Sequence, residues 1–391
     1  MSWGKAVIQG IRDLAPVSGF VFDVPIVVIQ SDDWGRVGVR DREGFEQLRT
    51  AGLELGDRPY DFYTLETAED LSALGAMLRR HRDSFDRHPC VEMNFVLGNL
   101  DFRKMGADGW QRIHVLPLAE GLPAGWVRPG LIEAYRSGIA DGLFHPALHG
   151  MTHFCRSEVE RNLAKDHERA TLIRTLWQAG TPYIHWRMPW IGYEYWAPEN
   201  RPDERFLPAD AQQQLIGETV GAFAKIFETL PSSACAPGYR ADENTLRTWA
   251  QHGVRVAQNG PETPTPPYFD RNEVLQLFRT IEFEPAVQEN FSLDACVRAA
   301  EGCFSEGIPA VISVHSINFH SSVRDFRTQT LNHLDAFLGA LEAKYSDLVY
   351  VHDAELYELV QNGTCSTQGG KLQLRVVKKK FRKAALRKKV V

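Results

Sequence analysis

Short apolar runs alternate along the chain with longer segments whose apolar residues recur at helical spacing. The apolar runs predict strands at 25–30, 90–97, 143–148, 232–238, 254–259, 309–315 and 348–353. The helical spacing predicts helices at 68–83, 130–142, 157–180, 209–230, 242–253, 293–307 and 325–345. Continuously apolar strands are typical of parallel sheets covered by helices on both faces. The alternation predicts the α/β class, and more than six such units favour a barrel or partial barrel over an open sheet.

The chain divides into a long globular part and a short basic end. Its 391 residues are 43% hydrophobic and 24% charged, an ordinary composition that can build one large core. We interpret residues 1–362 as a single barrel domain with an aromatic and proline-rich insertion at about 181–208. We interpret 363–391 as a flexible basic tail, because 371–391 holds ten Lys and Arg and no acid. The tail is either solvated or an amphipathic segment on an anionic membrane surface.

Charge and cysteine usage exclude several classes of protein. The formal net charge is −6, and the chain without its basic tail sums to about −16, which argues against a nucleic-acid partner. Six cysteines without C-x-x-C spacing indicate reduced thiols rather than a disulfide framework. The first residues lack a signal-peptide pattern, and no apolar run is long enough to span a membrane. We therefore expect a cytoplasmic protein.

The segment "FHPALHGMTH" at 144–153 places two histidines four residues apart, His149 and His153. On a helical turn such residues lie on one face, about 6 Å apart, where one metal ion can bridge them. The residue after the first histidine is Gly150, whereas the metalloprotease motif needs a glutamate there. A metal site therefore requires a third ligand from elsewhere in the chain.

Polar residues that follow other predicted strands supply that ligand. "SDDWGR" after strand 25–30 gives Asp32 and Asp33, and strand 309–315 ends in His315. The carboxyl ends of parallel strands meet at one end of a barrel, where catalytic residues gather. Two histidines and one aspartate make three ligands for Zn²⁺ or a similar ion and leave a position open for water and substrate. The other aspartate would take a proton from water and a histidine would protonate the leaving group, which predicts cleavage of an amide or ester.

These segments resemble the motifs of the polysaccharide deacetylase family, also known as the NodB homology domain or carbohydrate esterase family 4. "VVIQSDDWG" is similar to its first motif and "HGMTH" to its second. "SACAPGYRADENTLRTWAQHGV" is similar to the third motif region and "PAVISVHS" to the fifth. Their order also agrees over about 20–362, and the combination looks most like a divergent branch linked to bacterial surface polysaccharides.

The resemblance implies a distorted (β/α)7 barrel that removes an acetyl group from a sugar with the help of a divalent metal. Zinc is the expected metal, with cobalt, nickel or manganese as alternatives. The implied general base is Asp32 and the implied general acid is His315. The implied metal ligands are Asp33, His149 and His153. The implied substrate is an acetylated glycan, a sugar nucleotide or a lipid-linked saccharide in surface-polysaccharide or lipopolysaccharide synthesis.

The chain departs from the family at its third and fourth motifs. The arginine that holds the base aspartate is replaced at Cys235 or Ala236, and Arg240 is the candidate substitute. The fourth motif has no clear counterpart, and 277–285 is where it would lie. Two alternatives therefore stay open, a carbohydrate-binding module with impaired catalysis and an esterase or amidase for another acetylated substrate.

Several residues near the motifs are candidates for substrate binding. Trp34 would form a pocket wall, and Arg240 and Asn318 would contact the substrate. The aromatic side chains of the insertion form either a platform for sugar rings or a small core under a long loop: Trp186, Trp190, Tyr193, Tyr195 and Trp196.

Overall fold

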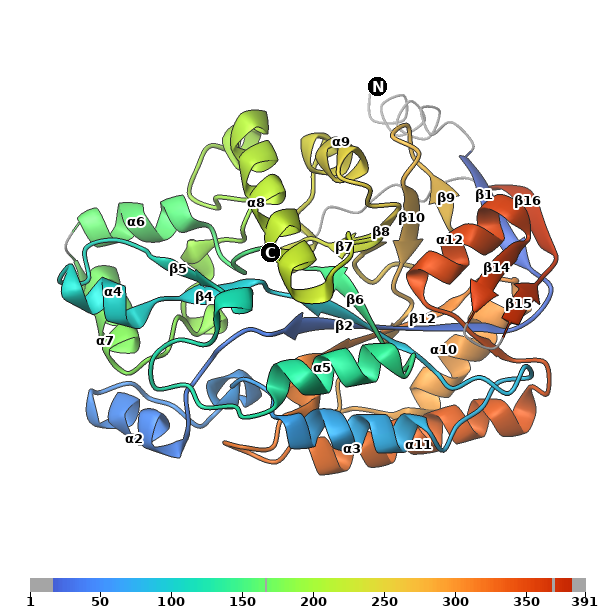
Figure 1. Cartoon of the computed structure of the whole chain (residues 1–391), viewed down its shortest axis with the longest axis horizontal. Helices are drawn as coiled ribbons and strands as arrows, with labels where there is room; N and C mark the ends of the chain where they lie inside the picture. The colour runs from blue at the N-terminus through green and yellow to red at the C-terminus, as the bar shows by residue number, and fades with distance from the viewer. Residues whose placement is uncertain (1–16, 166, 368–369, 382–391) are drawn as a thin grey trace, which may run out of the picture.

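A ten-stranded sheet forms the centre of the protein (Figure 1). The computed structural model describes residues 17–165, 167–367 and 370–381. Strands follow the order β11-β12-β2-β3-β6-β7-β8-β10-β9, and β13 pairs with β2 off this path. All pairs are parallel except β9 with β10. The strands are β2 (Ile26–Trp34), β3 (Val91–Phe95), β6 (Phe144–Leu148), β7 (Ser233–Cys235), β8 (Val256–Asn259), β9 (Tyr268–Phe269), β10 (Leu275–Phe278), β11 (Ile281–Glu282), β12 (Ala310–His315) and β13 (Val349–Tyr350).

Helices pack around this sheet. In Figure 1, α3, α5 and α11 lie on one side of β2, and α8, α9 and α12 lie on the other. Each buries one apolar stripe: in α8, Ile216, Val220 and Phe223 are buried at helical spacing. The predicted α/β class is confirmed. The helices are α2 (Arg42–Thr50), α3 (Ala68–Leu78), α4 (Phe102–Ala107), α5 (Leu131–Ala140), α6 (Arg156–Ala164), α7 (Glu168–Gln178), α8 (Ala209–Phe227), α9 (Glu243–Gln251), α10 (Leu293–Ser305), α11 (Arg327–Lys344) and α12 (Asp353–Asn362).

The sheet bends round on itself without closing in the described residues. One edge of the parallel array is β10 and the other is β11, yet only Arg279 and Thr280 separate these strands in the sequence. The two edges must therefore approach each other, but the linking residues do not pair as a ladder. The predicted distorted (β/α)7 barrel is thus not confirmed. The interior that the bent sheet encloses is polar near Arg279, which bonds to Asp32 of β2 and Gln258 of β8.

The structure corrects one helix of the sequence prediction. The segment 157–180, predicted as a single helix, forms α6 and α7, which pack on each other. Arg169 at the start of α7 donates a hydrogen bond to Asn162 of α6 over 3.1 Å. Apolar spacing continues across such a break, so periodicity alone does not reveal it.

Residues 364–381, predicted as part of a flexible tail, form β14 (Thr364–Thr367), β15 (Gly370–Gln373) and β16 (Val376–Phe381). β14 pairs with β15, and β16 pairs antiparallel along the whole of β1 (Val17–Phe22). Buried Leu372 and Leu374 join an apolar cluster with α12. A sequence reading misses these strands because the partner of β16 lies at the other end of the chain. Residues 382–391 of the predicted tail lie outside the described residues.

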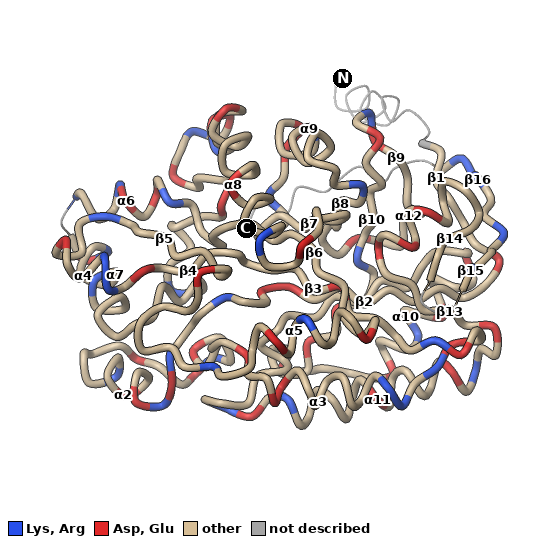
Figure 2. Tube along the Cα trace, viewed as in Figure 1, with Lys and Arg blue, Asp and Glu red and all other residues tan. Residues whose placement is uncertain are grey.

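Residues of both charges are distributed along the described part of the chain (Figure 2). Lys378, Lys379 and Lys380 lie together on the exposed strand β16. A further small sheet pairs β4 (Gly98–Leu100) with β5 (Val115–Pro117). Within the described ranges, no helix combines the length and the apolar character that crossing a membrane requires.

Candidate functional site

The end of β2 carries two adjacent carboxylates, Asp32 and Asp33, where its pairing with β3 is irregular. The register shifts between Ser31 and Trp34. Asp33 has a φ of 75°, a left-handed conformation that is uncommon for a residue with a side chain. In a regular strand these two side chains would point to opposite faces. The irregularity lets both carboxylates line one cavity.

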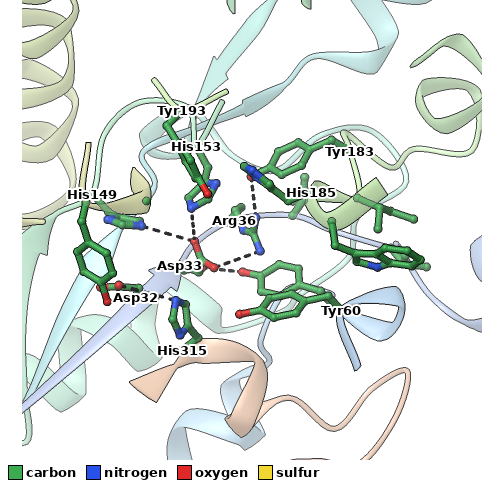
Figure 3. A pocket seen from close by; sticks show the side chains of 18 residues that line it. Asp32, Asp33, Arg36, Tyr60, His149, His153, Tyr183, His185, Tyr193 and His315 are labelled. Atoms are coloured by element: carbon green, nitrogen blue, oxygen red, sulfur yellow. Dashed lines mark hydrogen bonds and ion pairs between the residues drawn. The ribbon is translucent and has the colours of Figure 1, made fainter. Parts of the chain in front are cut away.

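Three candidate metal ligands meet at this cavity. Asp33 Oδ1 lies 3.3 Å from His153 Nε2 and 3.6 Å from His149 Nε2 (Figure 3). Ligand atoms bound about 2.1 Å from one ion are about 3.0–3.4 Å apart, so the observed spacing fits a shared divalent ion. Asp33 Oδ1 is buried and has no hydrogen-bond partner among the described residues. A cation would satisfy this oxygen, so the residues fit the metal that the sequence predicts.

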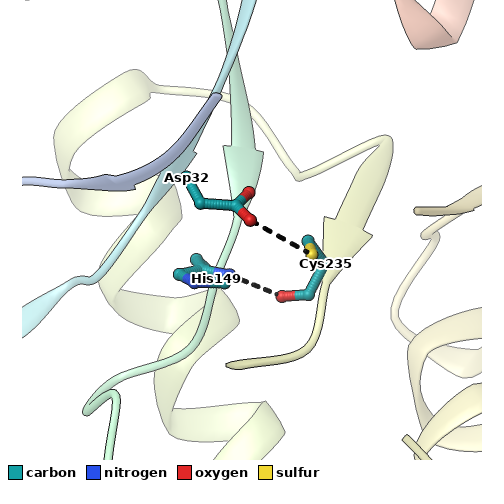
Figure 4. A group of neighbouring side chains, drawn as sticks. All are labelled: Asp32, His149 and Cys235. Carbon is teal, nitrogen blue, oxygen red and sulfur yellow. Dashed lines mark hydrogen bonds between the residues drawn. The ribbon is translucent and has the colours of Figure 1, made fainter. Parts of the chain in front are cut away.

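His149 is held with a defined ring nitrogen toward Asp33. Its Nδ1 lies 2.9 Å from the carbonyl oxygen of Cys235, which can only accept, so Nδ1 carries the proton (Figure 4). Nε2 of the neutral ring then offers its lone pair toward Asp33. Burial alone would lower the pKa of His149, but the charge of Asp32 raises it, so protons compete with a metal for Nε2. Burial lowers the pKa of His153, which favours its neutral ligand form.

Asp32, His149 and Cys235 form another group of ligand-type atoms beside the first (Figure 4). Asp32 in this group already pairs with the guanidinium of Arg279, whose positive charge would repel a cation. Burial raises the pKa of the Cys235 thiol, which disfavours the thiolate that a metal needs. Asp33, His149 and His153 are therefore the better ligand set.

Asp32 is fixed by Arg279, from the link between β10 and β11. Both guanidinium NH groups donate to Asp32, over 2.6 Å each, and Asn94 Nδ2 donates over 2.7 Å. The Arg279 side chain is fully buried. Burial alone would raise the pKa of Asp32, but the charge of Arg279 outweighs it and holds this pKa well below its usual range. Asp32 is therefore ionised and held in one orientation.

Asp33 is fixed by a second arginine. Arg36 NH2 lies 3.2 Å from Asp33 Oδ2, which leaves Oδ1 free to face the two histidines. Burial alone would raise the pKa of Asp33, but the charge of Arg36 helps to hold it well below its usual range. The Arg36 guanidinium lies 3.8 Å from the ring centre of Tyr63 and donates to the Tyr183 hydroxyl over 2.6 Å. Each carboxylate thus has its own buried cation.

His315, at the end of β12, faces Asp32 across the cavity. Its Nε2 lies 3.9 Å from Asp32 Oδ2, and its Nδ1 lies 2.6 Å from Glu284 Oε1. Burial alone would lower the pKa of His315, but the Glu284 carboxylate outweighs it and raises this pKa to about 9. Asn318 Nδ2 donates to the other oxygen of Glu284 over 2.6 Å. His315 is therefore an imidazolium at neutral pH, with one N–H toward the cavity.

The cavity is small and partly roofed by the insertion. Its volume is about 370 Å³, and Asp32, Asp33, His149, His153 and His315 all line it. The insertion contributes a wall of rings from Tyr183, His185, Trp186 and Tyr193. Tyr183, His185 and Tyr193 are labelled in Figure 3. His185 stacks on Tyr193 with ring centres 4.7 Å apart. The metal-binding and acid–base candidates thus share one aromatic-walled space.

Three candidates for substrate binding lie elsewhere. Trp34 is fully buried and stacks on Phe319 with ring centres 5.7 Å apart, so it does not form the predicted pocket wall. Arg240 is exposed, with its guanidinium 4.6 Å from the ring centre of Trp196, and Arg279 rather than Arg240 holds Asp32. Asn318 is buried beneath Glu284 and does not line the cavity. Register and loop position alone could not place these side chains.

The insertion also divides between the two predicted roles. Trp186 and Tyr193 line the cavity, as a sugar platform would require. Trp190, Tyr195 and Trp196 do not line it, and Tyr195 is buried in the core. The segment itself consists of short 3₁₀ turns, the first at His185–Arg187.

Arg279 and Glu284 were not predicted, although both lie within 277–285, where a counterpart of the fourth motif was expected. Both had a signal. An arginine interrupts the apolar run "LQLFRTIEF", and a charged residue inside a buried strand requires a partner of opposite charge. Glu284 follows that run, at the strand end where active-site groups collect. Arg36 and Tyr63 had no comparable signal, because their role depends on loop geometry.

The fold and site define a largely parallel α/β protein with a candidate Asp-His-His ligand set at the carboxyl ends of its strands. No known family profile and no curated protein matches the sequence. Among solved structures, the chain is similar to a Mycobacterium smegmatis protein assigned as a polysaccharide deacetylase, with 12% identity over 89% of this chain and 95% of that one and a TM-score of 0.47. It is similar to a Pseudomonas aeruginosa protein assigned likewise, with 11% identity over 87% and 92% and a TM-score of 0.44. It is also similar to a family 4 carbohydrate esterase of Streptomyces lividans in complex with acetate, with 12% identity over 83% and 91% and a TM-score of 0.35.

Proposed function

We propose that the protein is a divalent-metal-dependent hydrolase that removes an acetyl group from an N-acetylated sugar. The observation that carries the proposal is the convergence of five side chains on one cavity. The Nε2 atoms of His153 and His149 lie 3.3 and 3.6 Å from Asp33 Oδ1, and Asp32 and His315 face each other beside them. A divalent cation held by these three ligands would activate water and polarise the acetyl carbonyl.

Asp32 and His315 divide the proton transfers between them. Asp32, ionised beside Arg279, accepts a proton from the water that attacks the acetyl carbon. His315, kept protonated by Glu284, donates the proton of Nε2 to the sugar nitrogen as the C–N bond breaks. Acetate and the free amino sugar are the products. The aromatic wall from the insertion lines the same cavity as these groups.

Arg279 weakens the case for a catalytically impaired binding module. That alternative rested on the arginine missing near Cys235. Arg279, from the link between β10 and β11, donates two parallel hydrogen bonds to Asp32 and so supplies an arginine that holds this aspartate. Hydrolysis of an ester instead of an amide uses the same groups, except that an alkoxide leaving group needs less help from His315. The two reactions can be distinguished by experiment, because the rate of amide hydrolysis should depend more strongly on His315 than the rate of ester hydrolysis.

The proposed substrate is an acetylated saccharide presented as a sugar nucleotide or a lipid-linked intermediate. A cavity of about 370 Å³ accommodates roughly one sugar residue with its acetyl group. Exposed Lys378, Lys379 and Lys380 on β16 would bring the protein to an anionic membrane surface at the cytoplasmic face. A lipid-linked substrate would be presented there.

Removal and return of the metal test the proposal directly. Treatment with a chelator is expected to stop acetate release, and added Zn²⁺, Co²⁺, Ni²⁺ or Mn²⁺ should restore it, because Asp33, His149 and His153 hold the ion. The assay measures acetate from N-acetyl sugar nucleotides and from lipid-linked saccharides in anionic and neutral vesicles. Acetate release that is unaffected by complete metal removal would contradict the proposal.

Glu284→Gln is expected to shift the alkaline limit of activity. The wild-type rate should fall as pH rises through about 9, where His315 loses its proton. Glutamine keeps a hydrogen-bond acceptor for Nδ1 but removes the charge that raises this pKa, so the fall should begin at lower pH. The kcat–pH profile of both proteins on an N-acetyl substrate measures the shift. Superimposable alkaline limbs would show that His315 is not the acid.

A further inference from the structure

A second group of ligand-type side chains lies at the opposite end of the sheet from the candidate active site. Glu92 is near the start of β3 and His145 near the start of β6, and the two are register partners. His352 lies between β13 and α12. His145 and His149 are at opposite ends of one strand, four residues or about 13 Å apart. The second group is therefore separate from the active site.

The geometry of this group resembles that of the first. His145 Nδ1 lies 3.2 Å from Glu92 Oε1, and one ligand atom from each of Glu92, His145 and His352 lies within 4.8 Å of the other two. The rings of His145 and His352 stack with centres 4.1 Å apart and an angle of 12°. A metal shared by both histidines would turn one ring out of this stack. Glu92 is held in place by the Ser233 hydroxyl, which donates to the same oxygen.

Charge in this region is unbalanced. Glu92 and Asp353 are both fully buried. They are neighbours, since the Asp353 N–H donates to Glu92 Oε2 over 3.2 Å. Among the described residues no lysine or arginine pairs with either of them. The Asp353 carboxylate receives only amide donors, from Gln30 over 2.8 Å and Gln258 over 2.9 Å. Among the described residues, the one ion-pair partner of these two carboxylates is His145, which lies beside Glu92. Two buried carboxylates with a single histidine as partner are costly, and a divalent ion would neutralise them.

The group is open to solutes. A cavity of about 820 Å³ is lined by His145 and His352, whose side chains are 26% and 21% exposed. Cys90 and His88 lie on the same wall. An ion can therefore reach His145 and His352 from solution without passing through the active site.

We propose that Glu92, His145 and His352 form a second divalent-metal site at this end of the sheet. One carboxylate and two imidazoles are ligands suited to Zn²⁺, Co²⁺ or Ni²⁺. Asp353 contributes charge next to the ion. A hydrogen-bonded path of Asp353, Gln258 and Asn94 runs from this site to Asp32, with steps of 2.9, 2.7 and 2.7 Å. The ion thus anchors the far end of the polar interior that holds Asp32.

Metal stoichiometry in full-length variants tests the site without any assay of activity. Metal-free protein is titrated with Co²⁺, followed by visible absorbance, and bound Zn²⁺ is counted by elemental analysis. Wild type is expected to bind two ions. His149→Ala/His153→Ala should bind one, with the spectrum of the second site alone. His145→Gln/His352→Gln should also bind one, with the spectrum of the first site.

His88→Gln is the matched control, because His88 lines the same cavity outside the ligand group. It should bind two ions, like wild type.

Protonation of Asp353 and His145 is the alternative to metal binding as a way to neutralise this cluster, since burial and the charge of Glu92 raise the pKa of Asp353.

One ion in wild type and none in His149→Ala/His153→Ala would overturn the second site. One ion in wild type that persists in His149→Ala/His153→Ala but not in His145→Gln/His352→Gln would support the second site and overturn the first. The His149→Ala/His153→Ala protein leaves the second site intact, so a folding defect in the His145 and His352 variants does not prevent the test. Zn²⁺ should also raise the Tm of the His149→Ala/His153→Ala protein, and an unchanged Tm would count against the second site.

Discussion

Asp32→Asn is expected to abolish acetate release while the metal stays bound. An amide cannot take the proton from the attacking water, so the rate should fall by about 10²–10⁴. The ligand atoms of Asp33, His149 and His153 are untouched, so metal content should equal that of wild type. The measurement is acetate release and bound metal on one preparation, with a denaturation curve, because the change also leaves the buried Arg279 without its anion.

Two further variants separate the role of Asp32 from general damage to the site. His149→Ala removes a ligand, so both metal and activity should be lost. Cys235→Ser is the matched control: its thiol lies 3.9 Å from Asp32, but only its main-chain carbonyl holds His149. Metal content and rate should stay within a few-fold of wild type. Asp32→Asn protein that keeps more than about a tenth of the activity would exclude Asp32 as the base.

The strands and helices of the body were predictable because local signals and packing agree. β2 is apolar over 26–29 and buried throughout, as a strand with covered faces should be. The course of the sheet was harder to predict. Strands of two to four residues such as β10 and β11 have weak sequence patterns, and whether a sheet closes depends on the two residues between them. Strand β16 depends on a partner more than 350 residues away.

In the candidate site, too, residues with a strong local signal were predictable and those that depend on backbone geometry were not. His149, His153, Asp33 and His315 were predictable because each ends or follows a strong strand. The roles of the two aspartates depend on the backbone at Asp33, whose positive φ no residue pattern indicates. Trp34 was misplaced for the same reason, since the irregularity that turns both carboxylates into the cavity sends the indole into the core.

Arg279→Leu is expected to damage both stability and catalysis. The side chain is fully buried, and its removal leaves the Asp32 carboxylate without its charged partner. Breaking such a pair typically lowers the free energy of unfolding by about 3–5 kcal/mol. Burial would then raise the pKa of Asp32, so the base is protonated over more of the pH range and the rate falls. Arg279→Lys keeps the charge but not the two parallel hydrogen bonds. Its stability and rate should therefore lie between those of Arg279→Leu and wild type.

The cause of this loss can be isolated by combining the change with Asp32→Asn. If Arg279→Leu is destabilising mainly because it leaves the Asp32 carboxylate buried without a partner, the double variant lacks that carboxylate. Its loss in free energy of unfolding should then be about 1–3 kcal/mol smaller than the sum of the two single losses. Arg240→Leu is the matched control, because this exposed arginine only covers Trp196 and should cost about 1 kcal/mol or less, with activity retained. Urea denaturation of the four proteins measures the cycle. Additive losses would mean that Arg279 stabilises the interior through Gln30, Gln258 and Ser313 rather than through Asp32.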